Sequence, residues 1–176
     1  PTLYINGDDT FKSLIPGARY EKLDWLNKPD ELISKIRGSE IVIIDSYLAQ
    51  LDLYKKISAA STYAVYIDDN MRLDYPEGAV LNGSIYAEQL EYPNKFDTVY
   101  LLGPKYIPLR KDFWQSREKQ IKPEIQSVLI TFGGQDLTNL TPHILAFLVR
   151  NQPELIKKVV VGSGFKNLDL IIAAKD

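Results

Sequence analysis

Three polar residues follow one apolar run of the chain directly. Asp45, Ser46 and Tyr47 come after "IVII" and supply a carboxylate, a hydroxyl and a phenol at one point. Such a set at the end of a strand could orient a sugar or a water molecule. Asp45 or Ser46 could instead cap the following helix, but a cap does not require the phenol of Tyr47. We predict functional roles for Asp45 and Tyr47, and both interpretations stay open for Ser46.

A pair of carboxylates, Asp68 and Asp69, closes the apolar run "VYI". Paired carboxylates can bind Mg²⁺ or share acid–base work. Acidic residues in a turn ahead of a proline are also ordinary loop chemistry. We favour the loop interpretation, and we predict neither a metal site nor a cofactor.

Two glycines, Gly133 and Gly134, separate the apolar run "VLITF" from a helical pattern. Because they lack side chains, they would let an oxyanion approach the backbone, and the helix start adds free N–H groups and a positive dipole end. Asp136 and Asn139 could pin the turn. The pattern predicts a turn that binds phosphate, with a plain tight turn as the alternative.

Other polar features near these glycines have simpler explanations. Gly162-Ser163-Gly164 follows "VVV" and could be a second phosphate or ribose contact, or a plain strand–helix turn. His143 lies in the apparent first turn of the helix after Gly134, and we interpret it as a surface or packing residue. That helix could begin with Thr141 as its cap and Pro142 as its first residue.

The composition is typical of a globular chain that can bury a core. Of the 176 residues, 45% are hydrophobic and 25% charged, and the formal net charge is -2. The charge argues against a nucleic-acid partner, which usually requires a basic excess. The absence of cysteine excludes disulfides and thiolate metal sites and fits a cytoplasmic location, and a single histidine excludes a multi-histidine metal centre. No apolar run approaches the roughly 20 residues that span a bilayer.

The polar residues must be positioned by the strands and helices that surround them. Runs of β-branched and aromatic residues predict strands at 2–6, 40–47, 62–69, 78–84, 97–103, 127–134 and 157–164. Helical patterns cover 28–38, 49–61 and the stretch after the glycines. Runs such as "IVII" are continuously apolar, which is typical of parallel strands buried on both faces. Alternating strands and helices of this kind predict an α/β fold.

A polar, charged segment over residues 115–126 divides the chain. We predict a domain over 1–114, a linker over 115–126 and the start of a second domain over 127–176. The second part, with two strands and little more than one helix, is small for a core of its own. The first residue is a proline and the last residues stop within a helical pattern, so we expect a portion of a longer protein.

Several of these segments, in this order, resemble one enzyme family. The segments are "IIDSY", "VYIDDN", "VLNGSIYA", "LLGPKYIPLRKDFW" and "LITFGGQDLTNLT". They look like the hydrolases of the pseudaminic-acid pathway, which act on UDP-2,4-diacetamido-2,4,6-trideoxy-β-L-altropyranose, and like related spore-coat polysaccharide proteins. The resemblance covers roughly residues 38 to 165. It implies a GT-B fold similar to the MurG type, with two Rossmann-like domains.

The resemblance also implies roles for individual residues. Tyr47 matches an active-site tyrosine, and Asp45 matches the acid before it. The glycine turn with Asp136 and Asn139 matches the turn that faces the diphosphate of the nucleotide sugar. Asn82 and Tyr86 match an Asn and a Tyr at the next strand end. Gly103, Tyr106 and Arg110 match residues in the family's segment ahead of the interdomain linker.

One departure from the family concerns the catalytic base. The family's histidine lies in a Gly-x-Gly-His-x-x-Arg loop, which has no match here, so we expect the 176 residues alone to be inactive. For the whole protein we expect metal-independent hydrolysis of a UDP-sugar to UDP and a free 2,4-diacetamido sugar. The alternatives are a GT-B glycosyltransferase, a non-catalytic domain that binds nucleotide sugars, and a response-regulator-like domain that uses Asp45 or Asp68.

Overall fold

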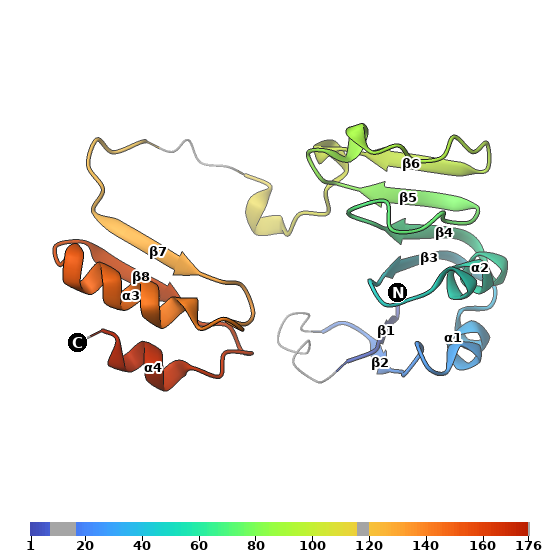
Figure 1. Ribbon diagram of the computed structural model, residues 1–176. Coiled ribbons are helices and arrows are strands. Elements are labelled where there is room, and N and C mark those ends of the chain that lie inside the picture. Colours follow the sequence, from blue (N-terminus) through green and yellow to red (C-terminus); the bar gives the residue numbers. More distant parts are fainter. Residues whose placement is uncertain (8–16, 116–119, 176) are drawn as a thin grey trace. The chain divides into compact units, whose positions relative to one another are not determined.

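The computed structural model describes residues 1–7, 17–115 and 120–175 (Figure 1). The chain divides into two compact units, Pro1–Gln115 and Ser116–Asp176, and each is described by itself. Both units contain parallel strands connected by helices, so the predicted α/β class is confirmed.

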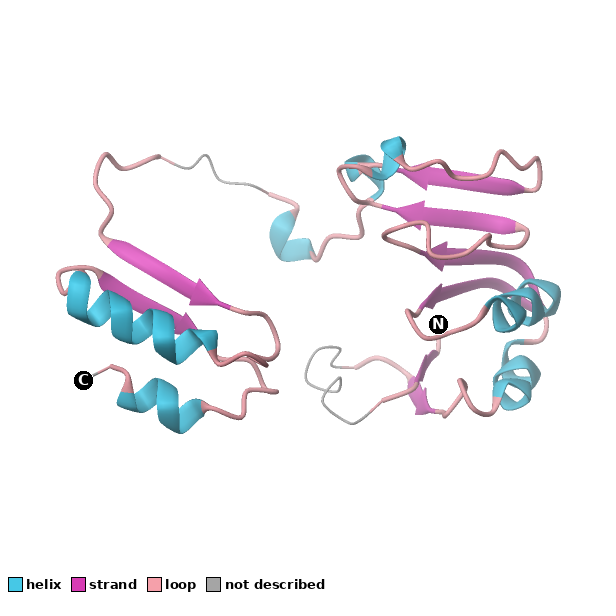
Figure 2. Ribbon diagram, in the orientation of Figure 1, coloured by secondary structure: helices cyan, strands magenta, loops and turns pink. Residues whose placement is uncertain are grey.

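The main sheet of the first unit has four parallel strands in the order β3-β4-β5-β6. Their bounds are β3 Ser39–Asp45, β4 Ser61–Ile67, β5 Gly78–Asn82 and β6 Thr98–Leu102. In Figure 2 the four arrows run alongside one another and point the same way. All four carboxyl ends therefore lie at one edge of the sheet, which is where parallel sheets bind ligands.

A second, two-stranded sheet precedes the main one. It pairs β1, Leu3–Ile5, in parallel with β2, Tyr20–Lys22. The sequence did not predict β2, because "YEK" has no apolar pattern. The helices that follow are α1, Pro29–Ile36, and α2, Leu51–Ala60; Asp30 and Glu31 lie in the first turn of α1 and Lys35 in its last, which suits the helix dipole.

The core of the first unit lies between these helices and one face of the main sheet. The buried residues include Leu32 and Ile36 of α1, Tyr54 and Ile57 of α2, and the strand residues Ile44, Ala64, Tyr66 and Val80. Tyr54, Tyr66 and Tyr75 contact one another with ring centroids 5.2–5.5 Å apart. Aromatic rings of this size supply much of the buried apolar area.

The opposite face of the main sheet differs from the prediction. Ile41 and Ile43 of β3 are 63% and 66% exposed, and Tyr63 of β4 and Val99 of β6 are exposed on the same face. β3 is therefore buried on one face, whereas its continuous apolar run "IVII" predicted burial on both. An apolar run records which residues tolerate burial and cannot show whether a covering layer is present.

The second unit has two parallel strands and two helices. The strands are β7, Ser127–Thr131, and β8, Ile156–Val160; the helices are α3, Leu140–Asn151, and α4, Leu168–Ala173. Ile130, Leu145 and Ile171 form its small core. Of the predicted linker 115–126, residues 116–119 lie outside the described part, and 120–126 contain no helix or strand.

Short 3₁₀ helices complete the described structure. They are η2, Ala87–Gln89; η3, Pro104–Tyr106; and η4, Lys111–Phe113. Within the described ranges, no helix has both the length and the apolar character needed to cross a bilayer.

Candidate functional site

The carboxyl edge of the main sheet brings Tyr47 and Asp69 together. Tyr47 follows β3 and Asp69 follows β4, and the Tyr47 hydroxyl donates a hydrogen bond to Oδ2 of Asp69. Tyr47 is 65% exposed, so the pair is open to solvent. The hydrogen bond to Asp69, and next the charge of that carboxylate, raise the pKa of the Tyr47 phenol. Tyr47 therefore stays protonated at neutral pH, with its oxygen lone pairs free to accept another hydrogen bond.

Ser46 shapes the turn after β3 but does not cap α2, since Gln50 occupies the cap position of that helix and no side chain caps it. Its Oγ accepts hydrogen bonds from the N–H groups of Leu48, at 3.2 Å, and Ala49, at 3.1 Å. These bonds satisfy the backbone of the turn between β3 and α2. Asp45 ends β3 with an exposed side chain that has no hydrogen-bond partner among the described residues. Of the three polar residues, Ser46 shapes the loop, while Asp45 and Tyr47 face solvent.

Asp68 and Asp69 have different surroundings although they are adjacent. Asp68 is buried, and its carboxylate accepts hydrogen bonds from the Tyr92 hydroxyl at 2.6 Å and the Arg72 N–H at 3.3 Å. Asp69 accepts from Tyr47 instead. Successive residues at a strand end point to opposite sides, which accounts for the difference. Asp68 thus holds loops together, and Asp69 is the carboxylate available to a ligand.

Asn82 belongs to the buried network around Asp68. Its side chain is 0% exposed; it donates to the Tyr92 hydroxyl at 3.0 Å and accepts from the Ser84 N–H at 3.0 Å. Burial, and then the hydrogen bond to Asp68, raise the pKa of Tyr92. Asn82 therefore supports the loop after β5 in this structure rather than facing a ligand. Tyr86, the other predicted residue of this loop, is exposed.

Gly83 and Gly103 lie in two of the segments that resemble the hydrolase family, and both have a structural reason to be glycine. A β-carbon at Gly83 would lie 2.6 Å from Cα of Ile107, so "NGS" and "GPKYI" contact each other through backbone. Gly103 has a φ of 94°, a conformation that side chains rarely adopt, and its N–H donates to the Asn82 carbonyl at 2.9 Å. Tyr106 is half-buried beneath the ammonium of Lys105, which lies 4.8 Å from the ring centroid. Arg110 is exposed.

In the second unit, Asp136 caps the helix α3. Its two carboxylate oxygens accept from the N–H groups of Leu140 and Thr141, each at 2.9 Å, and Nδ2 of Asn167 donates to it at 3.0 Å. Burial acts to raise the pKa of Asp136, but these donors outweigh it, and the pKa lies below its ordinary value. The helix starts at Leu140, with Asn139 at the cap position in a left-handed conformation, φ 54°. The sequence predicted that N–H groups at the start of this helix would bind an anion, but those of Leu140 and Thr141 already donate to Asp136.

The free backbone lies earlier in the turn, at the two glycines. Gly133 and Gly134 are exposed, and within the described part of the chain their N–H groups donate to no acceptor. A β-carbon at Gly134 would meet nothing within 4 Å, whereas Gly133 has a φ of 73°. An anion at this turn would therefore contact glycine N–H groups rather than the first turn of α3.

The second glycine pair has a structural explanation. A β-carbon at Gly162 would lie 2.5 Å from the carbonyl oxygen of Gly134, and one at Gly164 would lie 2.9 Å from it. The N–H of Gly164 also donates to that oxygen at 3.1 Å. The loop after β8 therefore supports the turn at Gly134, as the plain-turn alternative predicts. His143 is exposed on α3.

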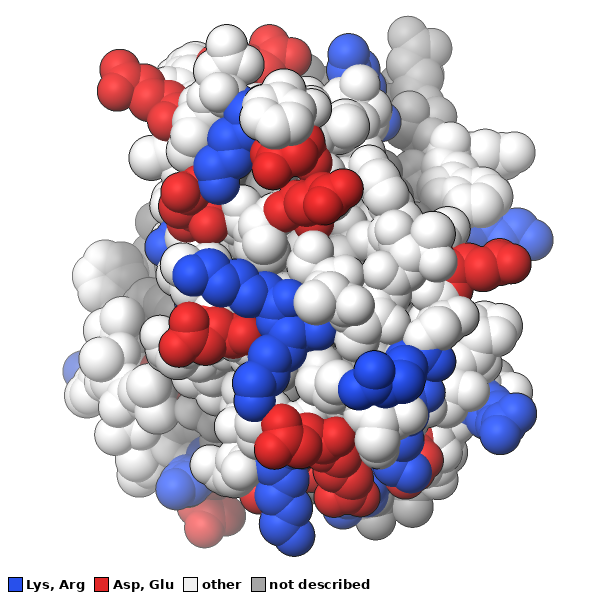
Figure 3. All heavy atoms as spheres, turned by 90° about the vertical axis from the view of Figure 1, so that its right-hand side faces the viewer, with Lys and Arg blue, Asp and Glu red and all other residues white. Residues whose placement is uncertain are grey.

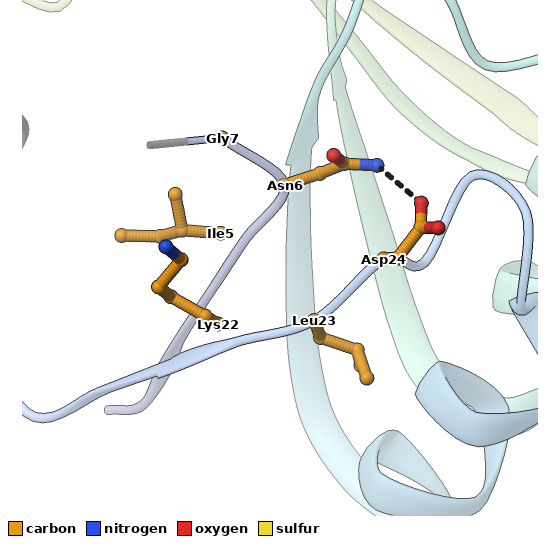
Figure 4. Close-up of a pocket in the computed structure, with 6 residues that line it drawn as sticks. All are labelled: Ile5, Asn6, Gly7, Lys22, Leu23 and Asp24. Atoms are coloured by element: carbon orange, nitrogen blue, oxygen red, sulfur yellow. Dashed lines mark hydrogen bonds between the residues drawn. The ribbon is translucent and has the colours of Figure 1, made fainter. Parts of the chain in front are cut away.

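A pocket beside β1 and β2 contains none of the predicted site residues. This shallow pocket of about 190 Å³ is lined by Ile5, Asn6, Gly7, Lys22, Leu23 and Asp24 (Figure 4). In it the amide of Asn6 points to Asp24, at 3.3 Å, and that carboxylate also accepts from Asn27. The face of the molecule in Figure 3 carries Lys and Arg interspersed with Asp and Glu. Among the described residues, no group of three or more His, Asp or Glu could hold a metal ion.

Comparison with curated proteins finds a weak similarity. An uncharacterized protein of Methanocaldococcus jannaschii is 28% identical to this chain over 138 residues. The match covers 74% of this chain and 28% of that protein, so the chain spans little more than a quarter of its length. A scan against protein-family models finds no match.

Proposed function

We propose that this chain is part of a nucleotide-sugar hydrolase that releases UDP and a free sugar of the 2,4-diacetamido class in surface-polysaccharide biosynthesis. The observation that carries the proposal is the exposed pair of Tyr47 and Asp69 at the carboxyl edge of a parallel sheet. Open parallel sheets bind ligands at that edge. The resemblance of five segments to one hydrolase family supplies the substrate class, and it suggests a GT-B arrangement and a cytoplasmic location.

In this proposal Tyr47 orients the sugar or the attacking water, and it does not transfer a proton. Its own proton is engaged by Asp69, so its oxygen accepts a hydrogen bond from a sugar hydroxyl or from the attacking water. Asp45, exposed at the end of β3, contributes a second acceptor. Hydrolysis joins the water oxygen to the anomeric carbon and breaks the bond to the diphosphate, and a base takes the water proton. The family resemblance assigns that base to a histidine loop that has no match in these residues.

The glycine turn of the second unit is the proposed diphosphate site. The exposed N–H groups of Gly133 and Gly134 are the donors, and Asp136 and Asn139 shape the turn that presents them. Backbone N–H groups in such a turn form a concave anion site. Asn82 supports the β5 loop, and Tyr86 is the exposed residue there that could contact the sugar.

The test is product analysis with the full-length protein in H₂¹⁸O. A UDP-2,4-diacetamido sugar is the substrate, and UDP-N-acetylglucosamine is the comparison. We expect UDP and free sugar as products. Because water attacks the anomeric carbon and not phosphorus, the ³¹P spectrum should show that the UDP contains no ¹⁸O. UDP that forms only when an acceptor sugar is added would identify a glycosyltransferase. Binding of UDP without turnover would identify a binding domain, and no binding in calorimetry would overturn the proposal.

A further inference from the structure

The side chain of Arg72 connects the loop after β4 to the loop that carries Tyr47. Nη1 donates to the carbonyl of Ala49 at 2.9 Å, and Nη2 donates to the carbonyl of Ser46 at 3.0 Å. Nη2 also lies 3.0 Å from the hydroxyl of Tyr54, and the guanidinium carbon is 5.6 Å from the centroid of that ring. The guanidinium therefore bridges two carbonyls on either side of Tyr47 and Leu48.

Only arginine has the geometry for this bridge. Its planar fork presents several N–H groups in fixed directions, whereas lysine has one nitrogen and cannot hold two carbonyls in the same way. The acceptors are all neutral, and among the described residues Arg72 forms no ion pair with a carboxylate. Because the fork is directed to the protein backbone and the side chain is half-buried, a role as a phosphate ligand does not suit it.

The backbone beside Arg72 also requires support. Met71 has a φ of 57°, a left-handed conformation that residues with a side chain adopt only when neighbouring contacts hold it. Those contacts are the N–H of Arg72, which donates to Asp68, and the guanidinium bonds to Ser46 and Ala49. The turn that contains Asp69 is thus attached at one end to the buried Asp68 and at the other to the Tyr47 loop.

We propose that Arg72 is a positioning residue, which holds the loop of Tyr47 in register with the loop of Asp69 so that the phenol reaches the carboxylate. Tyr47 itself is exposed and its side chain has no other hydrogen-bond partner among the described residues, so the position of its hydroxyl depends on its loop. The importance of this register for turnover rests on the proposed function. The structural role does not.

The first experiment measures amide hydrogen exchange in the full-length protein and needs no activity. The amides of Leu48 and Ala49 donate to Ser46 Oγ inside the loop that Arg72 holds. In Arg72→Lys we expect these two amides to exchange at least about tenfold faster, while the amides of α1 keep their rates. A control, Arg37→Lys, changes an exposed arginine at the end of α1 and should alter neither. Equal acceleration throughout the unit, or no change at Leu48 and Ala49, would overturn the proposal.

The second experiment is a double-mutant cycle on UDP-sugar hydrolysis. If Arg72 acts through Tyr47, Arg72→Lys should lower kcat by roughly tenfold with a smaller change in KM. The double variant with Tyr47→Phe should then be no slower than Tyr47→Phe alone. Additive losses would show that Arg72 acts on turnover by another route. If no variant or wild-type protein hydrolyses the sugar, the proposed function fails, and the exchange rates still decide the role of Arg72.

Discussion

Tyr47 and Asp69 lie 22 positions apart in the chain, and they form a hydrogen-bonded pair because β3 and β4 are parallel neighbours. The strands end level with each other, with Asp45 paired to Ile67 in the register of the sheet. Tyr47 and Asp69 each lie two residues beyond the end of their strand, and they therefore lie opposite each other at the carboxyl edge of the sheet.

The first prediction concerns the hydroxyl of this pair. Tyr47→Phe keeps the ring and removes the group that would contact the sugar or water. In the full-length protein we expect kcat to fall roughly 10- to 100-fold, on the order of 1.4–2.7 kcal/mol, with a smaller change in KM. The thermal midpoint should hardly move because the side chain is largely exposed. Steady-state kinetics with wild-type kcat in the variant would show that the Tyr47 hydroxyl has no role in turnover.

Asp69→Asn provides a companion measurement. The hydrogen bond to Asp69 and its charge raise the pKa of Tyr47, so removing the charge should bring that pKa down toward the ordinary value. A titration followed by the ¹³C resonance of the labelled phenol, assigned with Tyr47→Phe, measures this. An unchanged Tyr47 titration would mean that the pair is not formed in solution.

The second prediction concerns the glycine turn. Gly134→Val adds a side chain in open space, so it should leave the free protein as stable as before and weaken UDP binding by well over tenfold in calorimetry. Gly162→Ala is the contrast, because its β-carbon would meet the backbone of Gly134. That variant should lower stability by about 1–3 kcal/mol. UDP affinity unaffected by valine at 134 would exclude the turn as the diphosphate site.

Much of the fold follows from the sequence, and particular residues show where prediction stopped. The seven apolar runs all became strands, since such residues favour extended, half-buried backbone. The strand β2 was missed because Tyr20, Glu21 and Lys22 show no apolar pattern. The exposed Ile41 and Ile43 show that an apolar run does not reveal what covers a sheet.

The candidate site was predictable only in part. The sequence predicted that Asp45 and Tyr47 lie at the carboxyl end of a strand, and in the structure both are exposed there. The pattern could not show which carboxylate of Asp68 and Asp69 faces inward, because that depends on where the strand ends. Arg72 was missed because its acceptors are backbone carbonyls, which leave no trace in residue types.

The third prediction is that turnover does not depend on a divalent metal. Asp68 already accepts from Tyr92 and Arg72, and Asp69 accepts from Tyr47. Activity in EDTA should therefore equal activity in buffer with added Mg²⁺. Loss of turnover in EDTA that Mg²⁺ restores would instead assign Asp69 to a metal site.

The fourth prediction concerns Asp136 and acid. Because its donors hold the pKa below the ordinary value of about 3.9, Asp136 stabilises the fold above that pH, and the contribution is lost as pH falls through the lowered pKa. Asp136→Asn should lower the thermal midpoint at pH 7, and its difference from wild type should shrink near pH 3. Asp169→Asn, at an exposed acid in the first turn of α4, is the control. A constant difference across this range would contradict the prediction.

The last prediction compares two buried tyrosines, Tyr66 and Tyr75, which stack at 5.2 Å between centroids and 13° between planes. The Tyr66 hydroxyl donates to the carbonyl of Glu77 at 2.8 Å, whereas the Tyr75 hydroxyl has no hydrogen-bond partner among the described residues. Removing a satisfied buried hydroxyl costs about 1 kcal/mol, and removing an unsatisfied one is neutral or stabilising. The carbonyl of Glu77 keeps a second donor, Ser58, so Tyr66→Phe should cost no more than that.

Denaturant unfolding at pH 7 should therefore show a loss for Tyr66→Phe and no loss for Tyr75→Phe. Burial, and then the charge of Asp68, raise the pKa of Tyr75 above its ordinary value of about 10. A raised pKa in the folded state gives stability that is complete below the unfolded value and is lost as pH rises beyond it, by up to about 1.4 kcal/mol per pH unit. Tyr75→Phe should thus be relatively more stable than wild type above pH 10. A loss at pH 7 equal to that of Tyr66→Phe would show that the Tyr75 hydroxyl has a partner in solution.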